Sequence, residues 1–157
     1  LHKTIPFYSV FTIDHLTLGG HGKNAIGTFH TAYWDNTSTR PANIKFVKDF
    51  VAKYGYQPSI FAAQAYDAPF LIDAGVKAAG GDVSNKKAMI AGMEKVTHLP
   101  SKGKFRYNTN HIPIQNFYKR EVIADASGNP KIVTTGVVFK DHKDAYYKQC
   151  PAKSMKP

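Results

Sequence analysis

Residues 40–55 read RPANIKFVKDFVAKYG, and this stretch decides the fold class. Its apolar residues recur at helical spacing while lysines and an aspartate take the other side, which is the pattern of an amphipathic helix from Ala42 to Tyr54. Gly55 follows at the position where a left-handed residue commonly ends a helix. The sequence therefore predicts a helix with one buried face here.

Two further helices are predicted after it. One runs from Pro58 to about Ala79, and Pro69 inside it is expected to kink the axis without breaking the helix. A shorter helix is expected from a cap at Ser84 through Val96. Its two methionines are more typical of core filling than of metal binding.

Strand patterns flank the helices on both sides. The apolar, β-branched run 5–13 is typical of a strand buried on both faces of a parallel sheet, and residues 28–34 form a second strand pattern. Farther on, 104–107 is a short strand, and 114–124 is expected to pair with 131–139 as a β-hairpin. The order of strand, helix, strand, three helices and strands indicates an α/β fold.

A helix is also predicted from a cap at Asp14 to Asn24. Gly19, Gly20 and Gly22 lower its stability by up to about 1 kcal/mol each relative to alanine, which indicates close packing or a loosened turn. This glycine run lacks the spacing of a phosphate-binding loop, so a packing role is favoured.

The composition is that of a globular chain with excess positive charge. Of 157 residues 43% are hydrophobic, and 21 Lys and Arg against 11 Asp and Glu give a formal charge of +10. The basic residues are scattered as singletons and pairs, which indicates a solvated surface rather than a patch that grips nucleic acid. No apolar stretch approaches the ~20 residues of a membrane helix.

Patterns that would indicate catalysis are missing. The seven histidines lack the spacing of a zinc hydrolase and are expected on the surface or in loops. No serine lies in a Gly-x-Ser-x-Gly elbow, and the single cysteine, Cys150, has no neighbouring histidine and no partner for a disulfide within the chain. The sequence therefore predicts no enzyme, no metal site and no cofactor.

Several motifs in order resemble a known family. Residues 40–55 are followed by QPS at 57–59, AYDA at 65–68, AGGD at 79–82 and GKFRY at 103–107. This succession, which covers nearly the whole chain, resembles the leucine/isoleucine/valine-binding family of type I periplasmic solute-binding proteins of ABC transporters. Each motif alone is only moderately specific, and it is their order that carries the resemblance.

The resemblance implies a two-lobed, three-layer α/β/α fold of which this chain is the C-terminal portion. Residues 1–36 and 113–157 would then belong to the second lobe, and 37–112 would be a helical segment contributed to the first. The start at Leu1, without an initiator Met or signal core, fits a mature or truncated product. The middle helices would expose apolar faces, which a homodimer or a domain swap would cover.

By the same resemblance, the protein binds a small carboxylate ligand in a cleft between the lobes and presents it to a membrane permease outside the cytoplasm, without a nucleic-acid partner. Val10, Phe11 and Thr12 would face the cleft from one lobe, and Phe61 and Tyr66 from the other. The alternative for Phe61 and Tyr66 is that they are core aromatics. Asp67 would then be a helix or hinge partner, and any disulfide partner of Cys150 would lie upstream of Leu1.

The residues around the first strand bear on the ligand class. Amino-acid binders of the family place an acidic side chain near its end to meet the ammonium group, whereas this chain has Ser9-Val10-Phe11 there. We therefore expect an aromatic or aliphatic carboxylate without an ammonium group, although Asp14 could fill the acidic role and a branched-chain amino acid remains open. A ligand sensor of the same fold and, less favoured, a basic nucleic-acid-binding protein are the alternatives.

Overall fold

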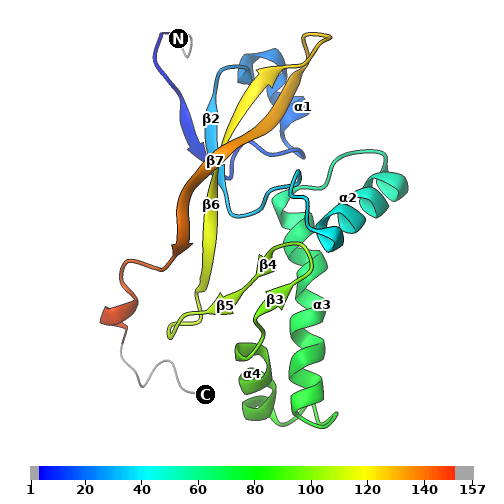
Figure 1. Ribbon diagram of the computed structural model, residues 1–157, viewed down its shortest axis with the longest axis vertical. Helices are drawn as coiled ribbons and strands as arrows, with labels where there is room; N and C mark the ends of the chain where they lie inside the picture. Colours follow the sequence, from blue (N-terminus) through cyan, green and yellow to red (C-terminus); the bar gives the residue numbers. More distant parts are fainter. Residues whose placement is uncertain (1–3, 151–157) are drawn as a thin grey trace.

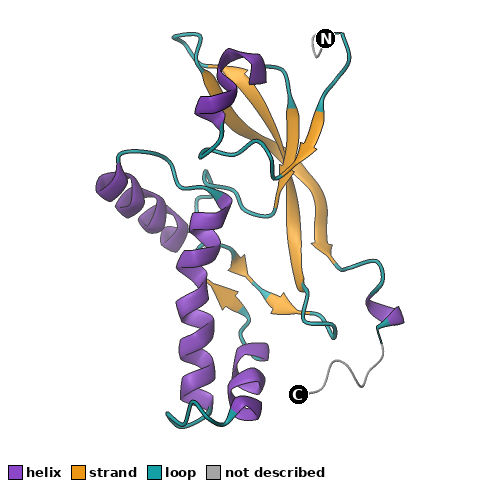
Figure 2. Ribbon diagram, turned by 180° about the vertical axis from the view of Figure 1, so that it is seen from behind, coloured by secondary structure: helices purple, strands orange, loops and turns teal. Residues whose placement is uncertain are grey.

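The computed structural model describes residues 4–150. A twisted sheet with one short helix lies at one end, three helices and a small hairpin lie at the other, and long strands run between them (Figure 1). Figure 2 shows from behind that the large helices gather beside the lower part of the long strands. The mixed α/β fold predicted from the sequence is confirmed.

The main sheet has the strand order β1-β2-β6-β5, and β7 pairs with β6 as well. These strands are β1 (Tyr8–Val10), β2 (Phe29–Ala32), β5 (Arg106–Tyr107), β6 (Pro113–Ala124) and β7 (Pro130–His142). β1 is parallel to β2, and the other pairings are antiparallel.

The long hairpin of β6 and β7 confirms the predicted pairing. Asp125 fixes its turn, because the Asp125 carboxylate accepts from the amides of Ser127 and Asn129, both at 2.9 Å. β6 pairs with β5 at residues 113–114 and with β2 at 118–121. Its register against β7 shifts twice between Gln115 and Tyr118, which lies between these two pairings, and once more between Lys119 and Arg120, within the pairing to β2.

Helices α2 (Pro41–Tyr54) and α3 (Ile60–Ala78) lie as predicted. Gly55 ends α2 with φ at +78°, a conformation that glycine adopts without strain. The hydroxyl of Ser59 caps α3 by accepting from the amide of Ala62 at 3.0 Å. α3 continues through Pro69.

Helix α4 (Lys86–Glu94) begins and ends slightly differently from the prediction. Asn85, not Ser84, is the cap, because the Asn85 Oδ1 accepts from the amide of Ala88 at 3.1 Å. The Ser84 hydroxyl instead donates to Asp82 at 2.6 Å. The helix also ends before the expected Val96.

α4 packs on α3 through two glycines. A Cβ at Gly92 would lie 2.5 Å from the Cβ of Ala78 and 2.7 Å from the carbonyl oxygen of Ala74, and Gly92 is buried. A Cβ at Gly75 would lie 3.0 Å from the Met89 carbonyl oxygen. The two backbones therefore approach more closely than any larger residue at Gly92 would allow.

The helix predicted from Asp14 to Asn24 is shorter and broken. It consists of α1 (Leu18–His21) and a 3-10 turn, η1 (Gly22–Ala25), joined at Gly22 with φ at +55°. The prediction of close packing at the glycine run was wrong, because nothing lies within 4 Å of a Cβ built at Gly19 or Gly20. The loosened turn was the correct alternative.

The first strand was predicted too long and too buried. β1 is three residues, and it pairs with β2 on one side only within the described part of the chain. Phe7, Tyr8 and Val10 are 50%, 70% and 57% exposed. As an edge strand with few neighbours, β1 has little to bury these side chains against.

Two apolar clusters hold the structure together. One joins the sheet to the helices through Ala32, Trp34, Phe46, Ile60 and Ala63. The other lies under α1 and contains Ile13, Ala25, Val122 and Ile132. The helices also leave apolar side chains exposed, as expected, including Ile44, Phe61, Phe70 and Ile72.

Three short elements complete the described chain: β3 (His98–Leu99), β4 (Gly103–Lys104) and a 3-10 turn, η2 (Tyr147–Gln149). β3 and β4 form a small antiparallel hairpin that the sequence did not predict. Over residues 4–150, every helix is too short or too polar to cross a lipid bilayer.

Candidate binding site at the end of strand β1

Phe11 ends β1 in an unusual backbone conformation. Its φ is +61°, which is uncommon for a residue with a large side chain. The half-buried ring packs edge-on against Tyr33 with the ring centroids 5.1 Å apart. The chain therefore turns sharply where β1 ends, beside the apolar cluster that joins sheet and helices.

The other predicted site residues lie around this point without sharing one cavity. Val10 and Phe61 are 57% and 55% exposed. Thr12 lines a shallow hollow of about 390 Å³ under α1. Tyr66 stacks on Phe46 with the centroids 4.4 Å apart and lines a separate groove between α2 and α3.

Phe11 and Tyr66 are nevertheless brought together, since both pack against the edge of the same apolar cluster. For Tyr66 the packing fits the core-aromatic alternative. Phe61 is too exposed to be a core residue, although it stands in the first turn of α3.

Asp14 joins the end of β1 to the start of α3. One carboxylate oxygen, Oδ2, accepts from the amide of Ile60 at 3.1 Å, and Oδ1 accepts from the amide of Leu16 at 3.1 Å. The side chain is 1% exposed. Both oxygens are thus used by backbone amides, so Asp14 caps α3 rather than the helix that follows it in sequence.

A buried cationic group lies near Asp14. Arg120 on β6 is 0% exposed, and its Nη2 lies 3.0 Å from Nε2 of His15. Burial, followed by the charge of Arg120, lowers the pKa of His15. The same two causes lower the pKa of His30 to about 4.

His30 was expected on the surface or in a loop, and this was wrong. It lies on β2, is 2% exposed, and both of its ring nitrogens are buried without a hydrogen-bond partner. Its alternation with half-buried neighbours in a four-residue strand was too short to reveal which face was buried.

Asp67 is a structural partner, as predicted. Its buried carboxylate accepts from the Ser101 amide at 2.9 Å and from the Ser101 hydroxyl at 2.6 Å. Burial raises the pKa of Asp67, and the hydrogen bonds from Ser101 oppose this shift. The pair ties the middle of α3 to the turn between β3 and β4.

The connection between β2 and α2 is held by a pair that the sequence analysis missed. The indole nitrogen of Trp34 donates to Oδ1 of Asn43 at 2.8 Å. The Asn43 amide nitrogen then donates to carbonyl oxygens of the connection, the shortest being Ser38 at 3.1 Å. A polar residue on the inner face of the predicted α2 was the available signal.

No cluster of three or more metal-ligating side chains occurs among residues 4–150. Cys150 is a free thiol there, and its sulfur lies 3.9 Å from the carbonyl oxygen of Tyr146. Phe11 and Tyr33 form an aromatic surface where the sheet meets the helices. Buried hydrogen bonds, from Ile60 to Asp14 and from Ser101 to Asp67, hold the neighbouring segments in place.

The chain was compared with known proteins. Residues 1–128 match the sequence profile of a family described as periplasmic binding protein. A solute-binding protein of an ABC transporter from R. palustris, solved in complex with benzoate, is 33% identical, with a TM-score of 0.77 over 90% of this chain and 38% of that chain. No curated protein matched the sequence.

Two more distant structures share the fold. A solute-binding protein from Rhodopseudomonas palustris in complex with 3,4-dihydroxybenzoic acid is 23% identical, with a TM-score of 0.70 over 84% of this chain and 36% of that chain. A leucine-binding protein from Thermotoga maritima is 19% identical, with a TM-score of 0.69 over 83% and 36%. The chain thus spans little more than a third of the length of these proteins.

Proposed function

Since the chain belongs to the periplasmic binding protein family, we propose that it is part of an extracytoplasmic solute-binding protein that delivers a small carboxylate to the permease of an ABC importer. The observation that carries the proposal is the 33% identity, over 90% of the chain, to a transporter solute-binding protein solved with benzoate. The protein would bind and release its ligand without making or breaking a bond.

The two-lobe division follows from this role. Residues 1–36 and 113–157 would form part of one lobe, and residues 37–112 would belong to the other. What supports this division is that the sheet and the helices lie at opposite ends of the long strands (Figure 1). The braced connection around Asn43 would be one crossing between lobes, and the start of β6 would be another.

The ligand would contact Val10, Phe11 and Thr12 from one lobe and Phe61 and Tyr66 from the other. Support comes from the exposure of Val10 and Phe61 and from the turn at Phe11. Ligands of α/β proteins generally bind beyond the carboxyl ends of strands, which is where Phe11 lies. Closure of the lobes would add contacts that the open form lacks, and these contacts would stabilise the closed form.

An aromatic or aliphatic carboxylate without an ammonium group is the ligand class that we propose. Asp14 is 1% exposed and each of its carboxylate oxygens accepts from a backbone amide, so it presents no accessible carboxylate to a ligand ammonium. Two aromatic rings, those of Phe11 and Tyr33, meet at the same place. The formal charge of +10 would also favour the approach of an anion.

Isothermal titration of the protein at its natural length with benzoate, 4-hydroxybenzoate and leucine tests the proposal. We expect binding of an aromatic acid and, at 100 times its Kd, stabilisation by about 2.7 kcal/mol. Binding of leucine alone would contradict the ligand class and keep the transport role. Failure of all three, with retention on DNA that falls steeply with salt, would contradict the function itself.

A further inference from the structure

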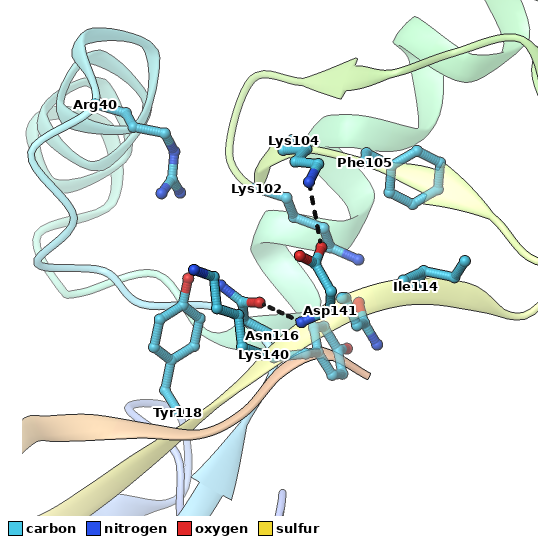
Figure 3. A pocket seen from close by; sticks show the side chains of 11 residues that line it. Arg40, Lys102, Lys104, Phe105, Ile114, Asn116, Tyr118, Lys140 and Asp141 are labelled. Atoms are coloured by element: carbon cyan, nitrogen blue, oxygen red, sulfur yellow. Dashed lines mark hydrogen bonds and ion pairs between the residues drawn. The ribbon is translucent and has the colours of Figure 1, made fainter. Parts of the chain in front are cut away.

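A cationic cavity of about 270 Å³ lies between the connection to α2, the turn before β4 and the lower parts of β6 and β7, and Tyr33 of the aromatic face is one of its lining residues (Figure 3). Four basic side chains line it together with one carboxylate: Arg40, Lys102, Lys104, Lys140 and Asp141. Three positive charges are therefore left without a negative partner in the cavity wall. Such an excess in a confined space favours an anion.

Arg40 is held in place before any ligand binds. Its Nη2 donates to the carbonyl oxygen of Ser101 at 2.6 Å. The side chain also lies against Gly103, where a Cβ would come within 2.7 Å of Arg40 Cδ and 2.8 Å of Nε. Gly103 has φ at +76°, so both its conformation and its lack of a side chain suit this contact.

One buried nitrogen of the Arg40 guanidinium has no partner. Nε of Arg40 is buried without a hydrogen-bond partner in the protein. Oε1 of Gln115, which lines the same cavity, is likewise buried and unpartnered. Both atoms have almost no accessible surface, so a ligand in the cavity would not reach them. Ser101 occupies only one N–H of the Arg40 Nη2 group, and the other Nη N–H groups are the donors left for a ligand.

Asp141 is a carboxylate in the cavity wall, and it already pairs with one of the lysines. Lys104 Nζ lies 3.5 Å from Asp141 Oδ1, and the Asp141 amide donates to Asn116 Oδ1 at 2.8 Å (Figure 3). Lys102 Nζ lies 4.7 Å from the centroid of Tyr33. Burial lowers the pKa of Lys102, and the charge of Asp67, which lies outside the cavity wall, opposes this shift. Asp141 thus neutralises one of the four cations from the rim.

We propose that this cavity binds a small oxyanion, and inorganic phosphate is the probe that tests it. The oxygens of the anion would accept from Arg40 and the lysines. The walls come from four separate segments of the chain, so one bound anion would tie the helical end to the long strands. Bound anion would therefore resist bending between the two ends of the molecule.

The test is calorimetric titration of the natural-length protein with inorganic phosphate at constant ionic strength, with sodium chloride as the balancing salt. Lys104→Gln should weaken phosphate binding by about fivefold, since it removes one of the cations. Asp141→Asn should tighten it by about the same factor, because a competing carboxylate is lost. Both side chains are substantially exposed, at 72% and 41%, so both variants should fold.

Lys131→Gln on the exposed start of β7 is the matched control, because it changes the net charge equally but lies outside the cavity. We expect phosphate affinity to be unchanged in this variant. Equal weakening in the two lysine variants, no tightening in Asp141→Asn, or equal heat from chloride would overturn the proposal. Titration of Lys104→Gln with benzoate should give the wild-type affinity, which separates this cavity from the proposed ligand face.

Discussion

The carboxylate of Asp14 accepts a hydrogen bond from the backbone amide of Ile60, 46 residues farther along the chain, at 3.1 Å. The bond fixes the first turn of α3 against the segment that leaves β1. Phe11 and Phe61, the two aromatic residues proposed to contact the ligand, flank this bond in sequence. The geometry of the proposed site thus depends on a residue that the ligand does not touch.

Replacing Asp14 with alanine should destabilise the fold. The amides of Ile60 and Leu16 would both lose their acceptors, and we expect a loss of about 3 kcal/mol in the free energy of unfolding. Denaturation in urea measures it. Asp49→Ala, which removes only an exposed pair with Lys45, should cost less than about 0.5 kcal/mol. Equal midpoints for the two variants would show that the Asp14 bonds contribute nothing.

Phe61 offers a test of the proposed ligand face that leaves stability intact. Because its side chain is 55% exposed, Phe61→Ala should change the unfolding free energy by less than about 0.5 kcal/mol. Its affinity for an aromatic acid should fall by about tenfold. Ile72→Ala, on the same helix and 54% exposed, is the control and should bind normally. Wild-type affinity in Phe61→Ala would remove Phe61 from the site.

The contact between α3 and α4 makes opposite predictions for two glycines. Gly92→Ala places a Cβ 2.5 Å from that of Ala78, and the helices would have to separate, at a cost of about 2 kcal/mol. Gly19→Ala, in α1, meets nothing within 4 Å and should be neutral or slightly stabilising. Thermal unfolding of both variants measures the difference. A tolerated Gly92→Ala would mean that the helices are not packed this closely.

Acid should destabilise the protein through His30. Its pKa in the folded state, about 4, lies below the ordinary value of 6.5, so the unfolded chain binds more protons between these values. Stability should therefore fall as the pH drops from about 6.5 to 4, by on the order of 3 kcal/mol from this residue.

His30→Phe should flatten this dependence, as measured by denaturation at several pH values. A residual slope of the same sign is expected from His15, whose pKa is also lowered. His21→Phe is the control, because His21 is exposed in α1, and its pH dependence should match that of the wild type. An unchanged slope in His30→Phe would show that folding does not lower the pKa of His30.

The helices could be predicted from the sequence because their signals are local. The spacing of Phe46 and Phe50 and the glycine at 55 lie within a few turns of one another, and α2 and α3 follow them closely. The length and the burial of the first strand were overestimated, because both depend on neighbouring strands that its own sequence does not specify. The same limit hid His30 and the pairing of Asp14 with a helix that begins 46 residues later.

The role of a residue in the candidate site could be predicted only where the motif that indicates it lies within one segment of the chain. Asp67 was expected, from the family resemblance, to be a helix or hinge partner if Phe61 and Tyr66 were core aromatics, and the structure shows it bonded to Ser101. The cationic cavity was not foreseen, since Arg40, Lys104 and Lys140 are far apart in sequence and read individually as solvated lysines and arginines. Only the fold brings them to one space.

The register shifts in β6 mark a position where the molecule can bend. The strand is held by β5 at 113–114 and by β2 at 118–121, and two of its three register shifts fall between these two pairings; the third lies between Lys119 and Arg120. Bulged segments bend more readily than regular ladders because fewer hydrogen bonds resist the change. Rotation of one end of the molecule against the other would therefore be concentrated in about four residues, and the sheet and the helices could each move as a rigid piece.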